Sequence, residues 1–223
     1  MTQNFATQVN NILAAFILLA SFGMLAQRRI YGLLVIFAWQ GFFLALSAGV
    51  VAYTADIKHL YISAALTLVL KVIVLPYILY SLVNRLNIFR DVEPLVNIPT
   101  TMLIGIALVI FSYHLTAPVR ELSTLFTRTT LAVALSTVLL GFLMMITRKK
   151  AVTQVIGFLA MENGLFFAAT SATYGMPLVV ELGVALDLLI AALIFGIFIF
   201  QIRTTFDTLD LREMEKLKEG SET

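Results

Sequence analysis

Three ionisable side chains, Lys71, Glu162 and Asp187, each lie near the middle of an apolar segment long enough to cross a bilayer. A charged group at that depth costs roughly 3 kcal/mol on insertion scales, so such residues usually pair with one another or line a polar route. Burial opposes the charged form of a carboxyl group, whereas a neighbouring cation favours it. The three residues therefore predict a route for protons or sodium ions. The alternative is a static ion pair that fixes helix packing.

Other polar residues within the apolar segments are further candidates for this route. Gln40 occurs in mid-segment, where it can either hydrogen-bond between helices or continue a polar route. Asn163 directly follows Glu162 in the sequence. Glu181 lies near the outer end of its segment and His114 at the outer end of another, where a lone histidine is more often solvated or packed than a proton relay. We therefore place Gln40 in the predicted route and treat the other three as additional candidates.

Lys71 is followed five residues later by Pro76. Because proline has no backbone N–H, it removes one helical hydrogen bond, and we expect a kink there that admits water. A lysine can instead extend to the membrane surface, but mid-depth makes this a long reach. The sequence thus predicts that Lys71 faces the interior of a helix bundle.

The composition indicates an integral membrane protein. Of the 223 residues, 60% are hydrophobic and 13% charged, whereas a soluble domain is about half apolar and a quarter charged. A net charge of +2, with basic residues clustered in short loops rather than forming a stripe, argues against nucleic-acid binding. The absence of cysteine excludes disulfides and thiolate-bound iron–sulfur clusters in this chain. We find no Walker loop and no nucleophile with a base, so we expect no catalytic site and no metal or cofactor site of its own.

Seven apolar segments approach the length of about 20 residues that crosses the hydrocarbon core. They cover residues 9–26, 32–53, 60–83, 100–115, 129–147, 152–174 and 178–202. With seven crossings, 11 of the 15 basic residues fall on one side of the membrane. Lys and Arg concentrate in cytoplasmic loops. The predicted fold is therefore an all-α membrane protein of seven transmembrane helices, with the N-terminus outside and the C-terminus in the cytoplasm.

Two sets of three helices show a similar pattern of residues. In each set the first helix ends in a basic cluster, the second carries a mid-depth polar residue and the third carries a mid-depth charge. Gln40 thereby corresponds to Glu162 or Asn163, and Lys71 corresponds to Asp187. This pattern predicts a parallel repeat of two three-helix units. The chain then has four parts: an N-terminal unit, a linker helix, a C-terminal unit and a cytoplasmic tail. Their boundaries are 1–98, 99–128, 129–203 and 204–223.

Several of these motifs resemble segments of the hydrogenase-4 component E family. In chain order they are Lys71-Val72 with Pro76, Met161-Glu162-Asn163-Gly164, Val180-Glu181-Leu182-Gly183-Val184-Ala185 with Asp187, and Thr208-Leu209-Asp210. The resemblance covers nearly the whole chain. It implies a multi-pass subunit in a prokaryotic cell (inner) membrane, within complex I-related energy-converting hydrogenases and formate hydrogenlyases.

The resemblance also implies partners and cofactors. The expected partners, besides the lipid bilayer, are antiporter-like membrane subunits, a membrane anchor subunit and a peripheral hydrogenase module. A nickel–iron centre and iron–sulfur clusters are implied in those partner subunits, and none in this chain. The function so implied is that of a non-catalytic subunit that contributes Glu162, Asp187, Lys71 and Gln40 to a proton or sodium path. The alternatives are a subunit of a multisubunit cation/proton antiporter and a purely structural bridge between antiporter-like subunits.

The last three predicted helices resemble, more distantly, the K subunit of respiratory complex I. That subunit carries one glutamate in each of its last two helices. Asp187 falls where the second glutamate is expected, and Leu159 where the first is expected. Glu162 follows Leu159 by three residues and so lies on nearly the same helical face.

Overall fold

A computed structural model describes residues 2–55, 58–85, 94–117, 125–173 and 183. These residues all belong to one compact unit, Met1–Val184; a second unit, Ala185–Thr223, lies outside the described residues. Within the described ranges the secondary structure is helical, apart from an isolated bridge between Pro94 and Arg148.

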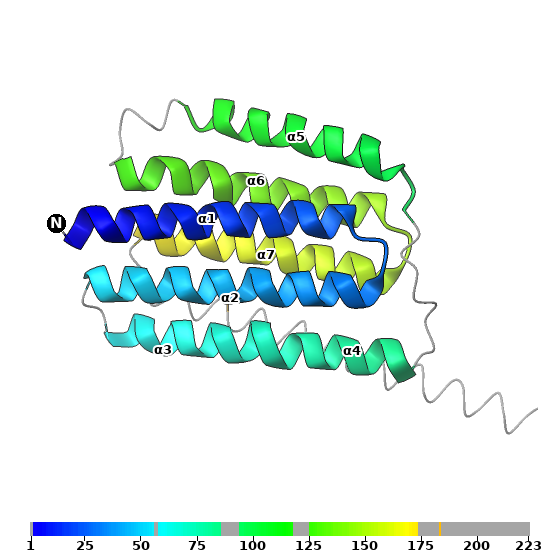
Figure 1. The fold of residues 1–223 in the computed structure, drawn as a ribbon, viewed down its shortest axis with the longest axis horizontal. Helices are drawn as coiled ribbons and strands as arrows, with labels where there is room; N and C mark the ends of the chain where they lie inside the picture. The colour runs from blue at the N-terminus through cyan, green and yellow to red at the C-terminus, as the bar shows by residue number, and fades with distance from the viewer. Residues whose placement is uncertain (1, 56–57, 86–93, 118–124, 174–182, 184–223) are drawn as a thin grey trace, which may run out of the picture. The chain divides into compact units, whose positions relative to one another are not determined.

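The described helices lie side by side as antiparallel rods (Figure 1). They are α1 (Thr2–Ala26), α2 (Ile30–Ala55), α3 (Lys58–Thr67), η1 (Leu68–Val74), α4 (Leu75–Arg85), α5 (Ile98–Leu115), α6 (Leu125–Thr147) and α7 (Ala151–Thr173). Helices α1 and α2 pack along each other, as do α6 and α7, and the two pairs meet through contacts of α1 with α6 and of α2 with α7. The segment formed by α3, η1 and α4 packs on α2.

Six of the seven predicted spans coincide with helices. By length and composition six described helices can cross a membrane: Phe5–Ala26, Ile30–Thr54, Leu60–Asn84, Ile98–Leu115, Thr130–Thr147 and Ala151–Thr170. The seventh predicted span, at 178–202, and the tail at 204–223 lie outside the described residues. The predicted orientation and the division into repeated units stay predictions.

The outer surface of the described helices is rich in apolar side chains, as expected for contact with lipid rather than water. Large apolar side chains such as Ile62, Tyr77 and Ile146 are each 71% exposed. Helix α5 buries only Thr101, Gly105 and Ser112 and turns its large apolar residues outward. Small and polar residues at helix contacts, with apolar residues outside, are typical of packing in membranes.

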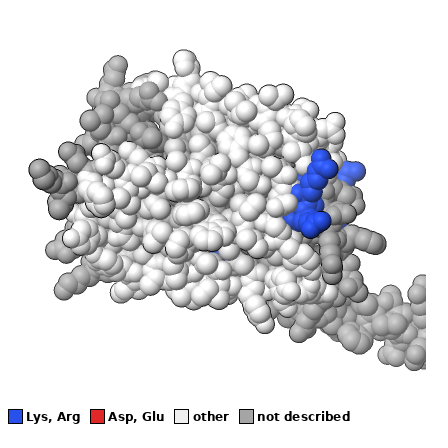
Figure 2. Space-filling view, in the orientation of Figure 1, with Lys and Arg blue, Asp and Glu red and all other residues white. Residues whose placement is uncertain are grey.

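Basic residues gather at one end of the helices. Figure 2 shows Lys and Arg side chains at that end and an otherwise uncharged surface on the face in view. The described basic residues there follow α1 at Arg28 and Arg29 and precede α7 at Lys149 and Lys150. This clustering is the asymmetry from which the sequence predicts a cytoplasmic side.

Arg148, in the same basic cluster, is not a surface charge, because its residue is only 2% exposed. Its Nη2 donates to the carbonyl oxygens of Met24, Leu25 and Gln27, at 3.3, 2.7 and 3.3 Å. These carbonyls end α1, where helical acceptors lack partners and the helix dipole favours a cation. Burial lowers the pKa of the Arg148 guanidinium, although an arginine stays protonated at neutral pH. Arg148 therefore binds the end of α6 to the end of α1.

Glycine contacts hold α6 and α7 unusually close. A Cβ atom on Gly141 would lie 2.7 Å from the backbone nitrogen of Met161, and one on Gly164 would lie 2.9 Å from that of Val138. Both distances are too short for a real Cβ atom, so only glycine fits at these two crossings. The residues that directly follow Met161 are Glu162 and Asn163. Their position is thus set by a backbone contact between the two helices.

The third span contains a π-helical stretch at its centre. Helix α3 continues through η1 into α4, and Figure 1 shows α3 and α4 in line. The N–H of Leu75 donates to the carbonyl of Leu70, five residues earlier, and the next residue is Pro76, which has no N–H to donate. The expected irregularity before Pro76 therefore takes the form of a widened helical stretch. Such stretches occur frequently at functional sites, and this one carries Lys71.

Candidate functional site

A buried network of polar side chains joins four helical elements at mid-span. Nζ of Lys71 in η1 lies 2.8 Å from Oε1 of Glu162 in α7 and donates to Oδ1 of Asn163 at 2.9 Å. Nδ2 of Asn163 donates to Oε1 of Gln40 in α2 at 3.0 Å. Nε2 of Gln40 donates to Oγ of Ser21 in α1 at 2.9 Å, and that hydroxyl donates to the carbonyl of Ile17. We call these five side chains the charge network.

The charge network is almost completely shielded from the surroundings of the helices. The exposed fractions are 1% for Lys71, 3% for Glu162, 0% for Asn163, 0% for Gln40 and 3% for Ser21. Lys71 and Glu162 both lie about 17 Å along their spans, since each is eleven residues from the start of its span at 1.5 Å per residue. An ion pair at this depth is costly unless its remaining hydrogen-bonding capacity is satisfied.

Close helix contacts position Lys71. A Cβ atom on Gly41 would lie 3.0 Å from Cβ of Lys71 and 3.3 Å from its carbonyl oxygen, so glycine lets α2 approach the π-helical stretch beside Gln40. Nζ of Lys71 also lies 5.5 Å from the ring centroid of Phe166, one turn along α7 from Glu162. A cation over an aromatic face gains electrostatic stabilisation. The ammonium group is thus held between an anion, an amide oxygen and an aromatic ring.

Donors along the network all point in one direction, from Lys71 through two amides to the hydroxyl of Ser21. Such aligned hydrogen bonds polarise one another and strengthen the chain. Amide N–H groups do not exchange protons as carboxyl or ammonium groups do. Asn163 accepts from Lys71 and is itself held by Gln40, so the two amides align the lysine, and the place of Gln40 in a proton route stays a prediction. The two ionisable side chains of the network are Lys71 and Glu162.

One oxygen of Glu162 has no hydrogen-bond partner among the described residues. Oε1 lies beside the lysine ammonium, whereas Oε2 is buried and has no partner in that part of the chain. A buried carboxylate oxygen without a donor is unfavourable by about 1–3 kcal/mol or more. Water, a bound proton or a donor from elsewhere removes that penalty.

The structure brings together four residues that the sequence singled out: Lys71, Glu162, Gln40 and the additional candidate Asn163. It does not place His114 with them, because His114 is exposed at the end of α5. Asp187 of the predicted route and the additional candidate Glu181 both lie outside the described residues.

Sequence reasoning missed Ser21, which ends the network on α1. Nothing in its immediate sequence marks a buried serine as a network member, because most such hydroxyls bond only to their own helix. Ser21 does this too, through the carbonyl of Ile17, and also accepts from Gln40. Its signal was positional: it is a hydroxyl within an apolar span, five residues before the end of Phe5–Ala26.

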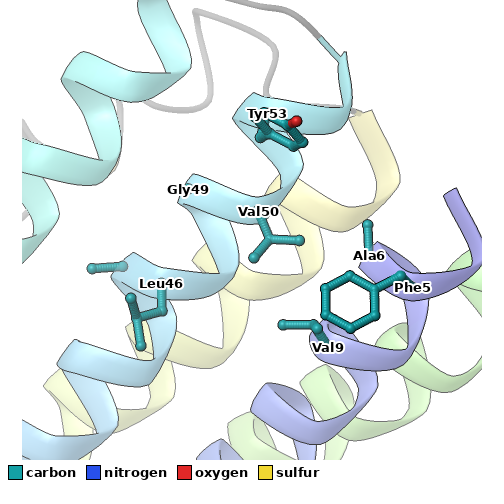
Figure 3. Close-up of a pocket in the computed structure, with 8 residues that line it drawn as sticks. Phe5, Ala6, Val9, Leu46, Gly49, Val50 and Tyr53 are labelled. Carbon is teal, nitrogen blue, oxygen red and sulfur yellow. The ribbon is translucent and has the colours of Figure 1, made fainter. Parts of the chain in front are cut away.

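A separate groove lies between α1 and α2, away from the charge network (Figure 3). Its volume is about 670 Å³, and its lining carries no ionisable group other than the phenol of Tyr53. The lining residues are Phe5, Ala6, Val9, Ala45, Leu46, Gly49, Val50 and Tyr53. The groove therefore adds no group to the chemistry of the network. Among the described residues, no cluster of three or more His, Cys, Asp or Glu side chains could hold a metal ion.

The fold and the network define a multi-pass helical membrane protein with an ion pair at mid-depth. The chain is 31% identical over 207 residues to an uncharacterized protein of Mycobacterium tuberculosis, Rv0085, which covers 92% of this chain and 94% of the relative. The chain therefore belongs to the same family as that mycobacterial protein.

A more distant relation connects the chain with hydrogenase-4 component E. The component E proteins of Escherichia coli and of Shigella flexneri are each 26% identical to it over 161 residues, which is 72% of this chain and 74% of the relative. This similarity supports the family resemblance inferred from the motifs. No family model matches the chain, and no solved structure does either.

Proposed function

We propose that this protein is a non-catalytic membrane subunit of a complex I-like, ion-translocating oxidoreductase of the energy-converting hydrogenase type. The similarity to hydrogenase-4 component E supports membership in such a complex. The six described apolar helices support a position in the membrane. In this proposal the nickel–iron centre and the iron–sulfur clusters belong to partner subunits, and no electron enters this chain.

The observation that carries the proposal is the Lys71–Glu162 ion pair at mid-span, with one carboxylate oxygen that has no donor among the described residues. Glu162 accepts a proton at Oε2, and Lys71 stabilises the deprotonated form. Because the pair is buried in a low-dielectric environment, gaining or losing one proton changes the field at neighbouring charges strongly. Asp187, which the sequence places at mid-depth of the next helix, is the proposed second proton acceptor.

The ion-pair proposal is tested by Glu162→Gln and Asp187→Asn in membrane vesicles that contain the assembled complex. We expect each amide variant to assemble and to retain electron transfer, but to translocate fewer ions per electron. Glu162→Asp is the matched control, because it keeps a carboxyl group at the same position. Normal ion translocation by both amide variants would contradict the assignment. Loss of assembly in both, with normal coupling in whatever complex forms, would favour a structural bridge.

Partner identity is tested by purifying the chain in mild detergent and identifying what accompanies it. Co-purification of antiporter-like subunits with a nickel- and iron-containing module is the expected result. Recovery of antiporter-like subunits alone, without either metal, would favour the multisubunit cation/proton antiporter.

A further inference from the structure

A row of polar side chains follows the buried face of the third span from the charge network toward the start of α3. Thr67 lies four residues before Lys71, and Ser63 lies four residues before Thr67. Side chains four residues apart lie on one face of a helix. Ser63 is 2% exposed and Thr67 3% exposed, so both face the interior as Lys71 does.

The hydroxyl of Ser63 differs from other buried hydroxyls in this protein. Those of Ser136, Thr137 and Thr170 each donate to the carbonyl four residues earlier in their own helix. Oγ of Ser63 is buried and has no hydrogen-bond partner within the described part of the chain. A buried hydroxyl in an apolar environment without a partner costs about 1–3 kcal/mol. Water is the smallest molecule that can serve as its partner.

The spacing of the row suits water. At 1.5 Å per residue, successive members of the row are about 6 Å apart along the helix axis. One water molecule that accepts from one hydroxyl and donates to the next spans about that distance, since each hydrogen bond is about 2.8 Å long. A short chain of water can therefore connect Ser63 and Thr67 with Lys71 without a change in the backbone.

The centre of the four helices α1, α2, α6 and α7 also holds a buried polar pair, in which the hydroxyl of Ser47 donates to Asn10. On the side of the network that faces the start of α3, this centre is filled by an apolar cluster that includes Ile17, Leu44 and Phe167, each 0% exposed. Water is excluded from tightly packed apolar interiors. Leu44 lies between Gln40 and Ser47 along α2, so this cluster separates the Asn10–Ser47 pair from the network. On the face of the third span, polar residues instead follow one another at every fourth position from Lys71 to Ser63.

We propose that the face of the third span marked by Ser63 and Thr67 holds a chain of water molecules that connects the Lys71–Glu162 pair with the membrane surface at which α3 begins. This inference deepens the proposed function, on which it rests, because it gives the buried pair access to one side of the membrane. The species that travels along this route is a proton carried by water. The hydroxyls of Ser63 and Thr67 hold the water in place.

The test uses cysteine accessibility, since the chain has no cysteine of its own. Ser63→Cys and Thr67→Cys are made singly in the full-length chain, within its native complex in membrane vesicles. Each is treated with a charged, membrane-impermeant methanethiosulfonate added on one side or the other. Matched controls are Ile62→Cys and Leu66→Cys, the preceding residues, which are 71% and 37% exposed on the apolar surface. Only a thiolate reacts with this reagent, and a thiol in hydrocarbon does not ionise.

We expect both test cysteines to react at least roughly tenfold faster than their neighbouring controls, because only they contact water. The reaction should occur from the side at which α3 begins. Rates no higher than those of both controls would overturn the proposal, as would reaction only from the opposite side. This outcome can be told apart from failure of the proposed function. That function is tested by the ions that the Glu162→Gln variant translocates per electron, and not by thiol reactivity. If either test variant does not accumulate, the other decides, because each has its own control.

Discussion

The Lys71–Glu162 ion pair makes a quantitative prediction about stability. At 2.8 Å the Coulomb attraction is about 6 kcal/mol with an effective dielectric constant of about 20. Desolvation of both ions opposes most of this gain. Removing one partner leaves the other charge buried and unpaired, which typically costs about 3–5 kcal/mol, whereas replacing both by apolar residues is often nearly neutral. The two single changes and the double change should therefore not be additive.

The perturbation is a double-mutant cycle with Lys71→Met and Glu162→Leu. Each single variant should lower the midpoint of thermal unfolding in detergent by roughly 6–20 °C, at about 2–4 °C per kcal/mol for a chain of this size. The double variant should recover most of that loss. The cycle subtracts the free energy that each side chain gains from other groups, such as Asn163 and Phe166. It thereby isolates the interaction free energy between Lys71 and Glu162.

If the losses of unfolding free energy in the two single variants add up to that of the double variant, to within about 0.5 kcal/mol, the predicted interaction is refuted. That result would mean that the two groups do not interact as charges in the folded protein. Ser136→Ala is a suitable control for the double variant, because the Ser136 hydroxyl is buried but bonds only to its own helix.

Three further predictions concern helix packing and are all tested by thermal unfolding in detergent. Arg148→Gln should destabilise the protein by about 3 kcal/mol or more, because charged hydrogen bonds to the end of α1 are lost. The control is Lys149→Gln, which is at an exposed position and should have little effect. Equal effects of the two changes would contradict a buried role for Arg148. Gly141→Ala should cost about 1–3 kcal/mol by forcing α6 and α7 apart, whereas Gly49→Ala, whose Cβ would meet nothing within 4 Å, should be tolerated. Ser21→Ala should cost about 1 kcal/mol, and no change would mean that Gln40 finds another acceptor.

The positions of the apolar helices could be predicted from the sequence because the bilayer requires long, uninterrupted apolar segments. The choice of Lys71, Glu162 and Gln40 as route residues, with Asn163 as an additional candidate, followed from the same physics, since polar groups at mid-depth need partners. Their pairing could not be predicted. Which amide lies between Lys71 and Gln40 depends on the rotation and separation of the helices, and these are set by Gly41, Gly141 and Gly164.

Two features were invisible to sequence reasoning for identifiable reasons. The positive-inside rule counts charges by loop and does not distinguish an exposed arginine from Arg148, which is buried against the end of α1. Hydropathy likewise reports how apolar a segment is, but not which carbonyl each N–H reaches. The π-helical stretch from Leu68 to Val74 therefore leaves no trace in the apolar pattern, although Pro76 marks its end.

That π-helical stretch has a consequence for how the third span tolerates changes in length. Each of its hydrogen bonds reaches one residue further than in an α-helix, so deleting a residue here would restore ordinary α-helical bonding rather than break the helix. Because the widened stretch absorbs the extra residue, the deletion would leave the parts of the span on either side of it facing as they do now. Leu60 and Leu79, both 0% exposed, would then be about 18 residues apart, or five turns at 3.6 residues per turn, and would still share the buried face. Without the widening, the surplus residue would turn one end of the span by about 100° against the other, so the π-helical stretch is what lets one span bury Leu60, Lys71 and Leu79 together.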